Sequence, residues 1–142
     1  EDVFIYQINK KPLGEIYTAE NYLIIEEPNN KDYLQSIKEF GLKKYAIFKK
    51  IDPNFKKSLP KSLMPLKYKF KKVIDGYVID FESSHEGLLL LNIPPLRWWV
   101  IKDQNGTKIN SHPANLNQMA VIINSKTKKL KVKYYRPTLF QN

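Results

Sequence analysis

The chain of 142 residues contains no cysteine, two histidines and five glycines, and each shortage excludes a kind of chemistry. Without cysteine there is no disulfide and no thiolate nucleophile, although the compartment stays open because extracytoplasmic domains can also lack cysteine. His85 and His112 are too few for a classical zinc site. Five glycines leave little room for a glycine-rich phosphate-binding loop. We therefore expect neither a metal nor a cofactor.

Long hydrophobic runs are also missing. The best one, Leu88–Leu91, ends at Asn92 and is far shorter than the roughly 20 residues that span a bilayer. The sequence begins at Glu1 without an initiator methionine and shows no signal peptide, so we expect a fragment of a longer protein. Hydrophobic residues make up 42% and aromatic residues 13%, which is enough for a folded core.

Basic charge is concentrated in two segments. The formal net charge is +10, and 22 of the 24 basic residues are lysine. Residues 43–72 carry +10 and residues 126–142 carry +6, whereas residues 1–42 carry −4 and residues 73–125 carry −2. Such clusters indicate an electrostatic partner or a solvated surface. Lysine suits diffuse attraction to anionic lipid or a polyanion better than bidentate recognition, which favours arginine.

Residues 1–68 are expected to form a small α/β element. Its β-prone runs are residues 3–8, 21–25 and 45–48. Between the last two, apolar residues at helical spacing predict a helix, which Asn30 or Asp32 can cap and Gly41 can end. Residues 52–72 contain three prolines among lysines and show no period, which predicts a long exposed loop with a soft domain boundary.

Residues 69–142 are expected to form an antiparallel β-sandwich of jelly-roll or immunoglobulin-like type. The expected strands are residues 73–82, 88–93, 98–102, 107–109, 119–123 and 130–134. Residues 88–93 are continuously apolar, which is typical of a central strand buried on both faces, and Asp103–Gly106 predicts a turn. The fold class is therefore α+β, and a core shared by the two halves remains an open alternative.

The second half carries an ordered set of features. An apolar strand, Gly87–Leu91, precedes Pro95 with Trp98. An acidic-glycine turn, Asp103 with Gly106, leads on to a strand that ends in Tyr-x-Pro at Pro137. This order resembles the soluble C-terminal portion of YfhO-type bacterial membrane proteins, a GT-C-like family of lipid-sugar-dependent glycosyltransferases. The chain departs from that pattern at Pro95–Trp98, where the family has Pro-Gly-Trp, and by the inserted residues 104–105.

The resemblance implies a non-catalytic extracytoplasmic domain of a polytopic bacterial membrane protein. In such proteins the catalytic acids are expected in the membrane part, so no catalytic residue is carried onto this chain. The implied location is the cell membrane, on its extracytoplasmic side. The implied partners are the transmembrane part of the parent chain, a glycan or a polyprenyl-phosphate-linked sugar, and an anionic membrane surface. A stand-alone carbohydrate- or polyanion-binding module of a secreted protein is the alternative.

Two sets of residues are candidates for binding. Trp98 and Trp99 lie in one expected strand, so one indole should pack in the core while the other, with Arg97, could contact a sugar or a membrane interface. The alternative is that the neighbouring sheet or the helical element covers both indoles. The candidate contacts to a membrane or polyanion are Lys67, Lys69, Lys71, Lys72, Lys129, Lys131, Lys133 and Arg136. Basic residues that alternate with aromatic ones also occur in proteins that bind single-stranded nucleic acid, and solvated strand faces give the same pattern. With the resemblance, a membrane surface is preferred and nucleic acid is not expected.

Other polar groups do not form a recognisable catalytic set. The carboxylates of Asp80, Glu82 and Glu86 could act as an acid–base pair, but a solvated strand face explains them as well. The pairs 84–85 and 111–112 each place a serine beside a histidine, which does not build a triad by adjacency alone. We assign no enzymatic activity to the chain itself.

Overall fold

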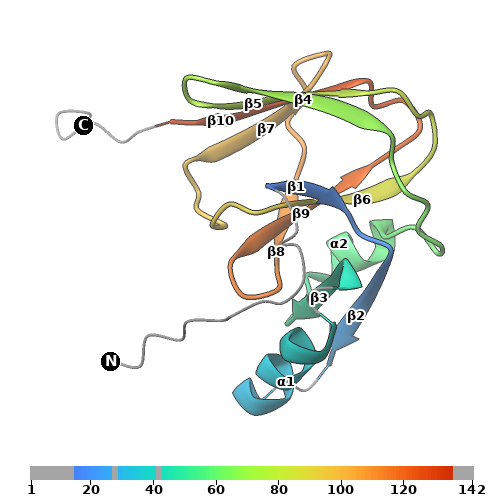
Figure 1. Ribbon diagram of the computed structural model, residues 1–142, viewed down its shortest axis with the longest axis vertical. Helices are drawn as coiled ribbons and strands as arrows, with labels where there is room; N and C mark the ends of the chain where they lie inside the picture. Colours follow the sequence, from blue (N-terminus) through green and yellow to red (C-terminus); the bar gives the residue numbers. More distant parts are fainter. Residues whose placement is uncertain (1–14, 27–28, 41–42, 136–142) are drawn as a thin grey trace, which may run out of the picture.

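The computed structural model describes residues 15–26, 29–40 and 43–135 (Figure 1). Within these residues the chain forms a small α/β element followed by a sandwich of two antiparallel sheets, which confirms the predicted fold class. The strand expected at residues 3–8 lies outside the described residues.

Two four-stranded sheets face each other in the sandwich. The strand order of the first sheet is β4 (Tyr68–Val73), β5 (Gly76–Phe81), β10 (Lys129–Tyr134) and β7 (Trp99–Asp103). The strand order of the second sheet is β1 (Ile16–Thr18), β6 (Gly87–Leu91), β9 (Gln118–Ile123) and β8 (Ser111–Ala114). Every strand pair in both sheets is antiparallel.

The α/β element lies against the second sheet and makes a third layer (Figure 1). Its parts are β2 (Asn21–Ile25), α1 (Asn30–Phe40), β3 (Tyr45–Lys49) and α2 (Pro53–Ser58). Strands β2 and β3 are parallel, joined by the crossover helix α1, as parallel neighbours require.

Strand β6 explains how the three layers hold together. Leu89 and Leu91 belong to the cluster between the two sheets, whereas Leu88 and Leu90 belong to the cluster between the second sheet and the α/β element. Side chains alternate between the faces of a strand, so a strand with a core on each side must be apolar at every position. The prediction of a central buried strand is confirmed, since all five residues of β6 are buried.

Both helices begin at side-chain caps, and the cap predicted for α1 was wrong by one residue. Asn29 Oδ1 accepts a hydrogen bond from the backbone N–H of Asp32 at 2.8 Å, which makes Asn29 the cap. In α2, Asp52 Oδ1 accepts from the N–H groups of Asn54 (2.8 Å) and Phe55 (3.1 Å). Both caps satisfy N–H groups of the first turn that have no partner within the helix.

The structure corrects the sequence prediction in three further places. The loop predicted over residues 52–72 contains α2 and most of β4. Strands β1 and β8 were not predicted, because β1 has three residues and β8 contains Pro113, which an edge strand tolerates. The strand expected at residues 107–109 is only a single bridge between Lys108 and Lys102.

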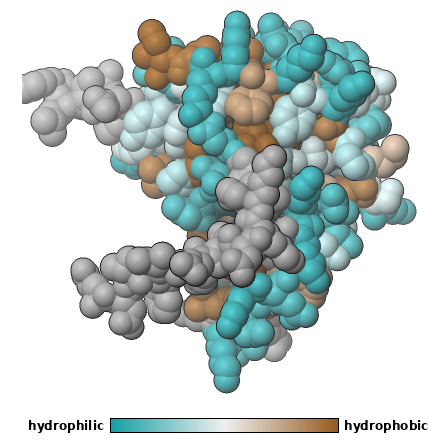
Figure 2. Space-filling view, in the orientation of Figure 1, coloured by the Kyte–Doolittle hydropathy of each residue, from teal (hydrophilic) through white to brown (hydrophobic). Residues whose placement is uncertain are grey.

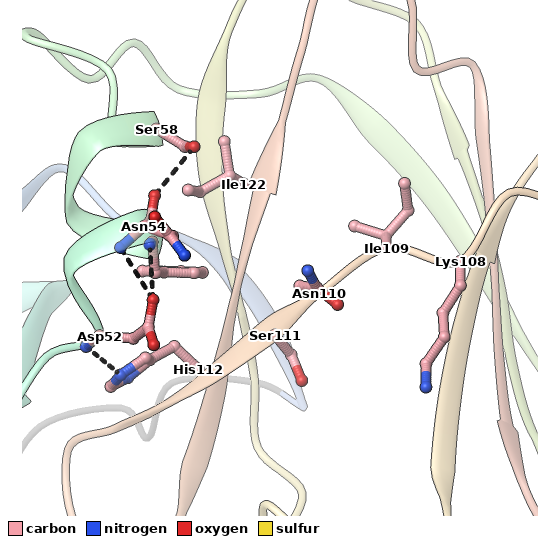
Figure 3. Close-up of a pocket in the computed structure, with 10 residues that line it drawn as sticks. Asp52, Asn54, Ser58, Lys108, Ile109, Asn110, Ser111, His112 and Ile122 are labelled. Atoms are coloured by element: carbon pink, nitrogen blue, oxygen red, sulfur yellow. Dashed lines mark hydrogen bonds between the residues drawn. The ribbon is translucent and has the colours of Figure 1, made fainter.

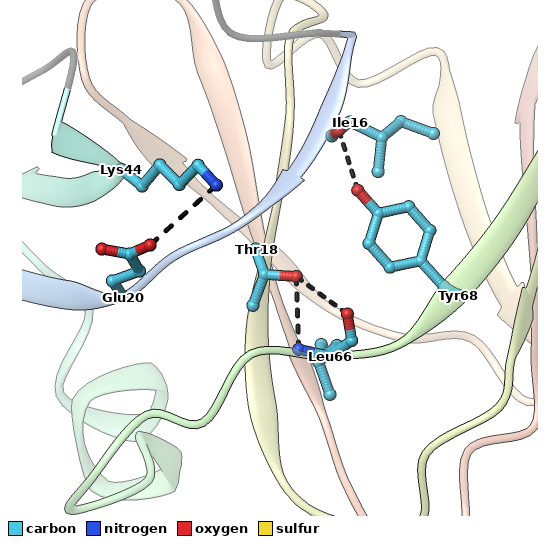
Figure 4. A network of polar contacts seen from close by, with 6 residues as sticks. All are labelled: Ile16, Thr18, Glu20, Lys44, Leu66 and Tyr68. Atoms are coloured by element: carbon cyan, nitrogen blue, oxygen red, sulfur yellow. Dashed lines mark hydrogen bonds and ion pairs between the residues drawn. The ribbon is translucent and has the colours of Figure 1, made fainter.

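Polar contacts join β1, in the second sheet, to the start of β4 in the first sheet and to the segment just before it (Figure 4). The Tyr68 hydroxyl donates to the Ile16 carbonyl at 2.9 Å, and Thr18 Oγ1 exchanges 3.4 Å hydrogen bonds with the backbone of Leu66. Thus β1, from the first half of the sequence, completes a sheet of the sandwich. The proposed division into residues 1–68 and 69–142 stays a prediction.

Candidate functional site

The outer face of the β4-β5-β10-β7 sheet gathers lysines from three strands. Lys71 pairs with Val78, and Val78 pairs with Lys131. Lys131 in turn pairs with Lys102 on β7. Cross-strand partners point to the same face of a sheet, so three lysines lie in one row. Val132, next to Lys131, is buried in the cluster between the sheets, which means that the row faces solvent.

Carboxylates compensate the lysines only at the end of this face far from the β4–β5 turn. The Glu82 carboxylate lies 3.8 Å from Lys67 Nζ and 3.4 Å from Lys69 Nζ. Asp80 Oδ1 lies 3.6 Å from Lys129 Nζ. Among the described residues, no carboxylate lies within 4.0 Å of the ammonium groups nearer the turn. These uncompensated lysines are Lys71, Lys102, Lys131 and Lys133.

The face carries a net charge of +5 from seven lysines and two carboxylates. They are Lys67, Lys69, Lys71, Lys102, Lys129, Lys131, Lys133, Asp80 and Glu82. Like charges directly across two strands destabilise a sheet, so the pairing of Lys131 with Lys102 works against folding. The row of lysines therefore has no explanation in the stability of the sheet.

The structure brings together most, but not all, of the lysines chosen from the sequence. Lys72 points to the other face of β4, where its Nζ lies 2.6 Å from Glu15 Oε1. This hydrogen bond, with the charge of Glu15, raises the pKa of Lys72. Arg136 lies outside the described residues. Lys102 was missed, because only the register of β7 against β10 places it beside Lys131.

The two tryptophans occupy different environments at one end of the sandwich. Trp99 packs against the core between the sheets, with its ring centroid 5.1 Å from that of Tyr134. Trp98 lies in the turn before β7, half-buried, and the Arg97 guanidinium stands 4.1 Å from its ring centroid. This is a cation–π distance. Arg97 therefore occupies one face of the indole that the sequence offered for sugar stacking.

The same end of the sandwich is hollowed and rich in apolar side chains. A hollow of about 660 Å³ lies between the β4–β5 turn and the loop before β7. Its lining residues are Lys72, Val73, Ile74, Asp75, Gly76, Tyr77, Pro94, Leu96, Trp99 and Tyr134. Figure 2 shows hydrophobic surface, in brown, at the corner where the β4–β5 turn lies. Ile74 is 100% exposed and Leu96 is 49% exposed.

A second hollow, of about 550 Å³, lies between α2 and β8 (Figure 3). His112 lines it, but both of its ring nitrogens are engaged by the backbone. The Asp52 N–H donates to Nε2 at 3.0 Å, and Nδ1 lies 2.8 Å from the Pro113 carbonyl, which can only accept. These partners assign the ring proton to Nδ1. The Asp52 carboxylate caps α2 through Oδ1, so both groups have a structural role at the start of this helix.

The remaining polar candidates do not converge on a reacting centre. Ser111 Oγ donates to the sulfur of Met119 at 3.6 Å and not to the neighbouring imidazole. Asp80 and Glu82 are engaged by the lysines of the outer face. Within the described residues no three His, Cys, Asp or Glu side chains group as metal ligands would. No helix in that part of the chain has the length and hydrophobicity to cross a bilayer.

Comparison of the chain with protein-family models, with curated proteins and with solved structures found no match. The resemblance to the YfhO-type glycosyltransferases therefore stays a prediction. What the chain does has to be argued from the lysine face and the hollowed end of the sandwich.

Proposed function

We propose that this chain is a non-catalytic domain that binds an anionic membrane surface through lysines on the outer face of the β4-β5-β10-β7 sheet. The observation that carries the proposal is the set of four uncompensated lysines, Lys71, Lys102, Lys131 and Lys133, on one solvent-facing surface. In line with the resemblance, we place the domain on the extracytoplasmic side of a polytopic bacterial membrane protein of the lipid-carrier-dependent glycosyltransferase kind.

Electrostatics support a lipid partner. A lysine near an anionic bilayer gains about 1 kcal/mol, so four such residues together supply about 4 kcal/mol, which corresponds to a dissociation constant of about 1 mM. Lysine ammonium groups attract a diffuse layer of phosphates without demanding a fixed geometry. Lysines spread over three strands fit an extended anionic surface better than a single small anion.

The test compares two triple variants with equal loss of charge. Lys71→Gln, Lys102→Gln and Lys131→Gln together remove the row. The control, Lys38→Gln, Lys57→Gln and Lys61→Gln, removes three exposed lysines from α1 and the α2 region. In sedimentation with phosphatidylglycerol vesicles, the row variant should lose most of its binding and the control should lose little. Equal loss in both variants would show that binding depends on the net charge of the chain and not on the row of lysines, which would overturn the assignment to this face.

A polyanion other than lipid is the competing outcome of the same experiment. Single-stranded nucleic acid or heparin that binds the wild-type chain more tightly than the vesicles do, with the same dependence on the row, would overturn the lipid assignment. Nucleic-acid binding would in addition show a steep logarithmic dependence on salt.

A second candidate function, binding of a glycan, rests on the hollow at the sandwich end. Three aromatic rings, those of Tyr77, Trp99 and Tyr134, border it together with the polar groups of Lys72 and Asp75. Aromatic faces beside charged hydrogen-bonding groups can hold a sugar ring. Saturable binding of an oligosaccharide that Tyr134→Ala abolishes, while the circular dichroism spectrum stays unchanged, would favour this function over lipid binding.

A further inference from the structure

The β4–β5 turn carries a hydrophobic side chain that the fold does not use. Val73 and Gly76 are paired, so the turn between them consists of Ile74 and Asp75 alone. Two-residue hairpin turns favour asparagine, aspartate and glycine, and Ile74 is none of these. Its side chain is 100% exposed, so it contributes no burial to the core.

A second loop brings more apolar surface to the same place. Leu96, 49% exposed, and Val73, 43% exposed, line the hollow beside Ile74. Trp98, from the loop that holds Leu96, and Tyr135, just after β10, are joined by a hydrogen bond from the Tyr135 N–H to the Trp98 carbonyl at 2.9 Å. Tryptophan and tyrosine favour the boundary between water and bilayer, because their rings are apolar with a polar edge.

On the outer face, the lysines near this turn have no carboxylate partner, whereas those farther away do. Lys133 pairs with Gly76, directly beside the turn, and Lys71 is three residues from Ile74. Farther along the strands, Lys69 and Lys129 are compensated by carboxylates. On the outer face, the uncompensated lysines are thus those nearest the exposed apolar tip. The carboxylate of Asp75, in the turn, opposes them there, and that of Glu15 is paired with Lys72 on the other face of β4.

We propose that the sandwich docks on the bilayer by its end, with Ile74 and Leu96 inserted among the lipids and the neighbouring uncompensated lysines at the phosphates. This inference rests on the proposed function and adds to it an orientation and an apolar anchor.

The dimensions of a strand fit this arrangement. A strand rises about 3.3 Å per residue, which puts the backbone of Lys71 about 10 Å above that of Ile74. Interfacial segments bury their apolar groups about 5–10 Å deep at the boundary of headgroups and acyl chains. With Ile74 at that depth, the Lys71 and Lys131 row stands at the level of the headgroup phosphates.

The test uses the native tryptophans, because both lie at this end and the chain has no others. Vesicles of phosphatidylglycerol with brominated acyl chains should quench and blue-shift the fluorescence of the bound wild-type chain. At about 0.5 M salt, where charges are screened beyond about 4 Å, part of the binding should persist.

The variant Ile74→Ser with Leu96→Ser should lower the vesicle partition coefficient about tenfold or more and abolish the binding that survives high salt. Leu34→Ser with Leu116→Ser is the matched control, since both leucines are exposed and lie on α1 and in the β8–β9 turn. It should bind like the wild type. Asp75→Asn should strengthen binding, because it removes the opposing carboxylate.

The outcomes separate the two proposals. Binding at low salt that is unchanged in the Ile74→Ser/Leu96→Ser variant, without quenching by brominated lipid, would overturn the end-on insertion and leave electrostatic binding intact. No binding of the wild-type chain at low salt would overturn both proposals.

Discussion

Gly76 lies at the start of β5, directly against the backbone of β10. A Cβ atom built on this residue would lie 1.8 Å from the Val132 carbonyl oxygen, a backbone atom that cannot move without breaking the sheet. We expect Gly76→Ala to destabilise the protein by more than about 3 kcal/mol. The measurement is urea unfolding followed by circular dichroism.

Gly106 provides the contrast for that substitution. Its φ is +78°, in the left-handed region, but a Cβ there would meet no atom within 4 Å. Gly106→Ala should therefore cost only the conformational strain, about 1–2 kcal/mol. Equal costs for the two alanines would show that the close approach to Val132 does not matter.

Tyr17 links stability to alkaline pH. Its hydroxyl donates to Gln118 Oε1 at 2.6 Å and accepts from Asn115 Nδ2 at 3.4 Å. Burial raises the pKa of Tyr17 above the ordinary value of 10.0, while these two hydrogen bonds oppose part of that rise. A pKa that is higher in the folded state means that stability is complete below about pH 10 and is lost as the pH rises through the folded-state pKa. The unfolding free energy of the wild type should accordingly fall as the solution becomes strongly alkaline.

Tyr17→Phe should change both the size and the pH dependence of the stability. The variant should lose about 1 kcal/mol at neutral pH, where the hydrogen bond is intact, and show a shallower alkaline decline. A residual slope is expected, because burial also raises the pKa of Tyr68. Denaturant titrations between pH 8 and pH 11 measure both effects, and an unaltered slope in Tyr17→Phe would exclude Tyr17 as a source of the decline.

At the scale of elements, α2 depends on one cap. Asp52 holds the first turn through two N–H groups, and Pro53 occupies the first helical position, where its missing N–H costs nothing. Asp52→Ala should destabilise the protein by about 1 kcal/mol, whereas Asp52→Asn, which caps equally well, should change little. Chemical denaturation of the two variants measures the difference, and similar losses would show that charge and not capping is what Asp52 supplies.

Elements with a clear hydrophobic period were predictable from the sequence, and the others were not. Alternation located β5 and β10, and the unbroken apolar run located β6. Helix α2 has only six residues, too few to show a period, and its one signal in the sequence is the helix start at Asp52–Pro53.

The sequence predicts which lysines of one strand share a face, but not which strands lie side by side. Spacing two residues apart put Lys129, Lys131 and Lys133 on one face. Nothing in the sequence states that β10 lies between β5 and β7, so the addition of Lys102 depended on register. Lys72 faces the other way because it directly follows Lys71 in β4, a segment that was predicted to be a loop. The exposed Ile74 was missed because a single hydrophobic residue in a turn has no period to reveal it.

At the scale of the whole molecule, the α/β element and the sandwich meet through Phe48. This side chain on β3 is fully buried and shares a cluster with Leu88 and Leu90 of β6. Phe48→Ala should cost about 3–5 kcal/mol. If the cluster couples the layers, the variant should lower the unfolding midpoint seen by tryptophan fluorescence, although both tryptophans belong to the sandwich end.

Unfolding of the wild type followed by fluorescence and by circular dichroism should then give coincident curves. A Phe48→Ala variant whose fluorescence midpoint stays unchanged while its circular dichroism changes would show two independently folding units divided near residue 68, instead of one shared core.

The distribution of charge over the whole molecule is the basis of the proposed function, and one measurement tests it most directly. The partition of the wild-type chain into vesicles is measured at low salt as the fraction of phosphatidylglycerol in a neutral lipid increases. We predict weak binding to neutral vesicles, through the apolar tip alone, and a steep rise with the anionic fraction, because the uncompensated lysines respond to surface potential. Absence of binding at every anionic fraction would contradict the proposed binding to an anionic membrane.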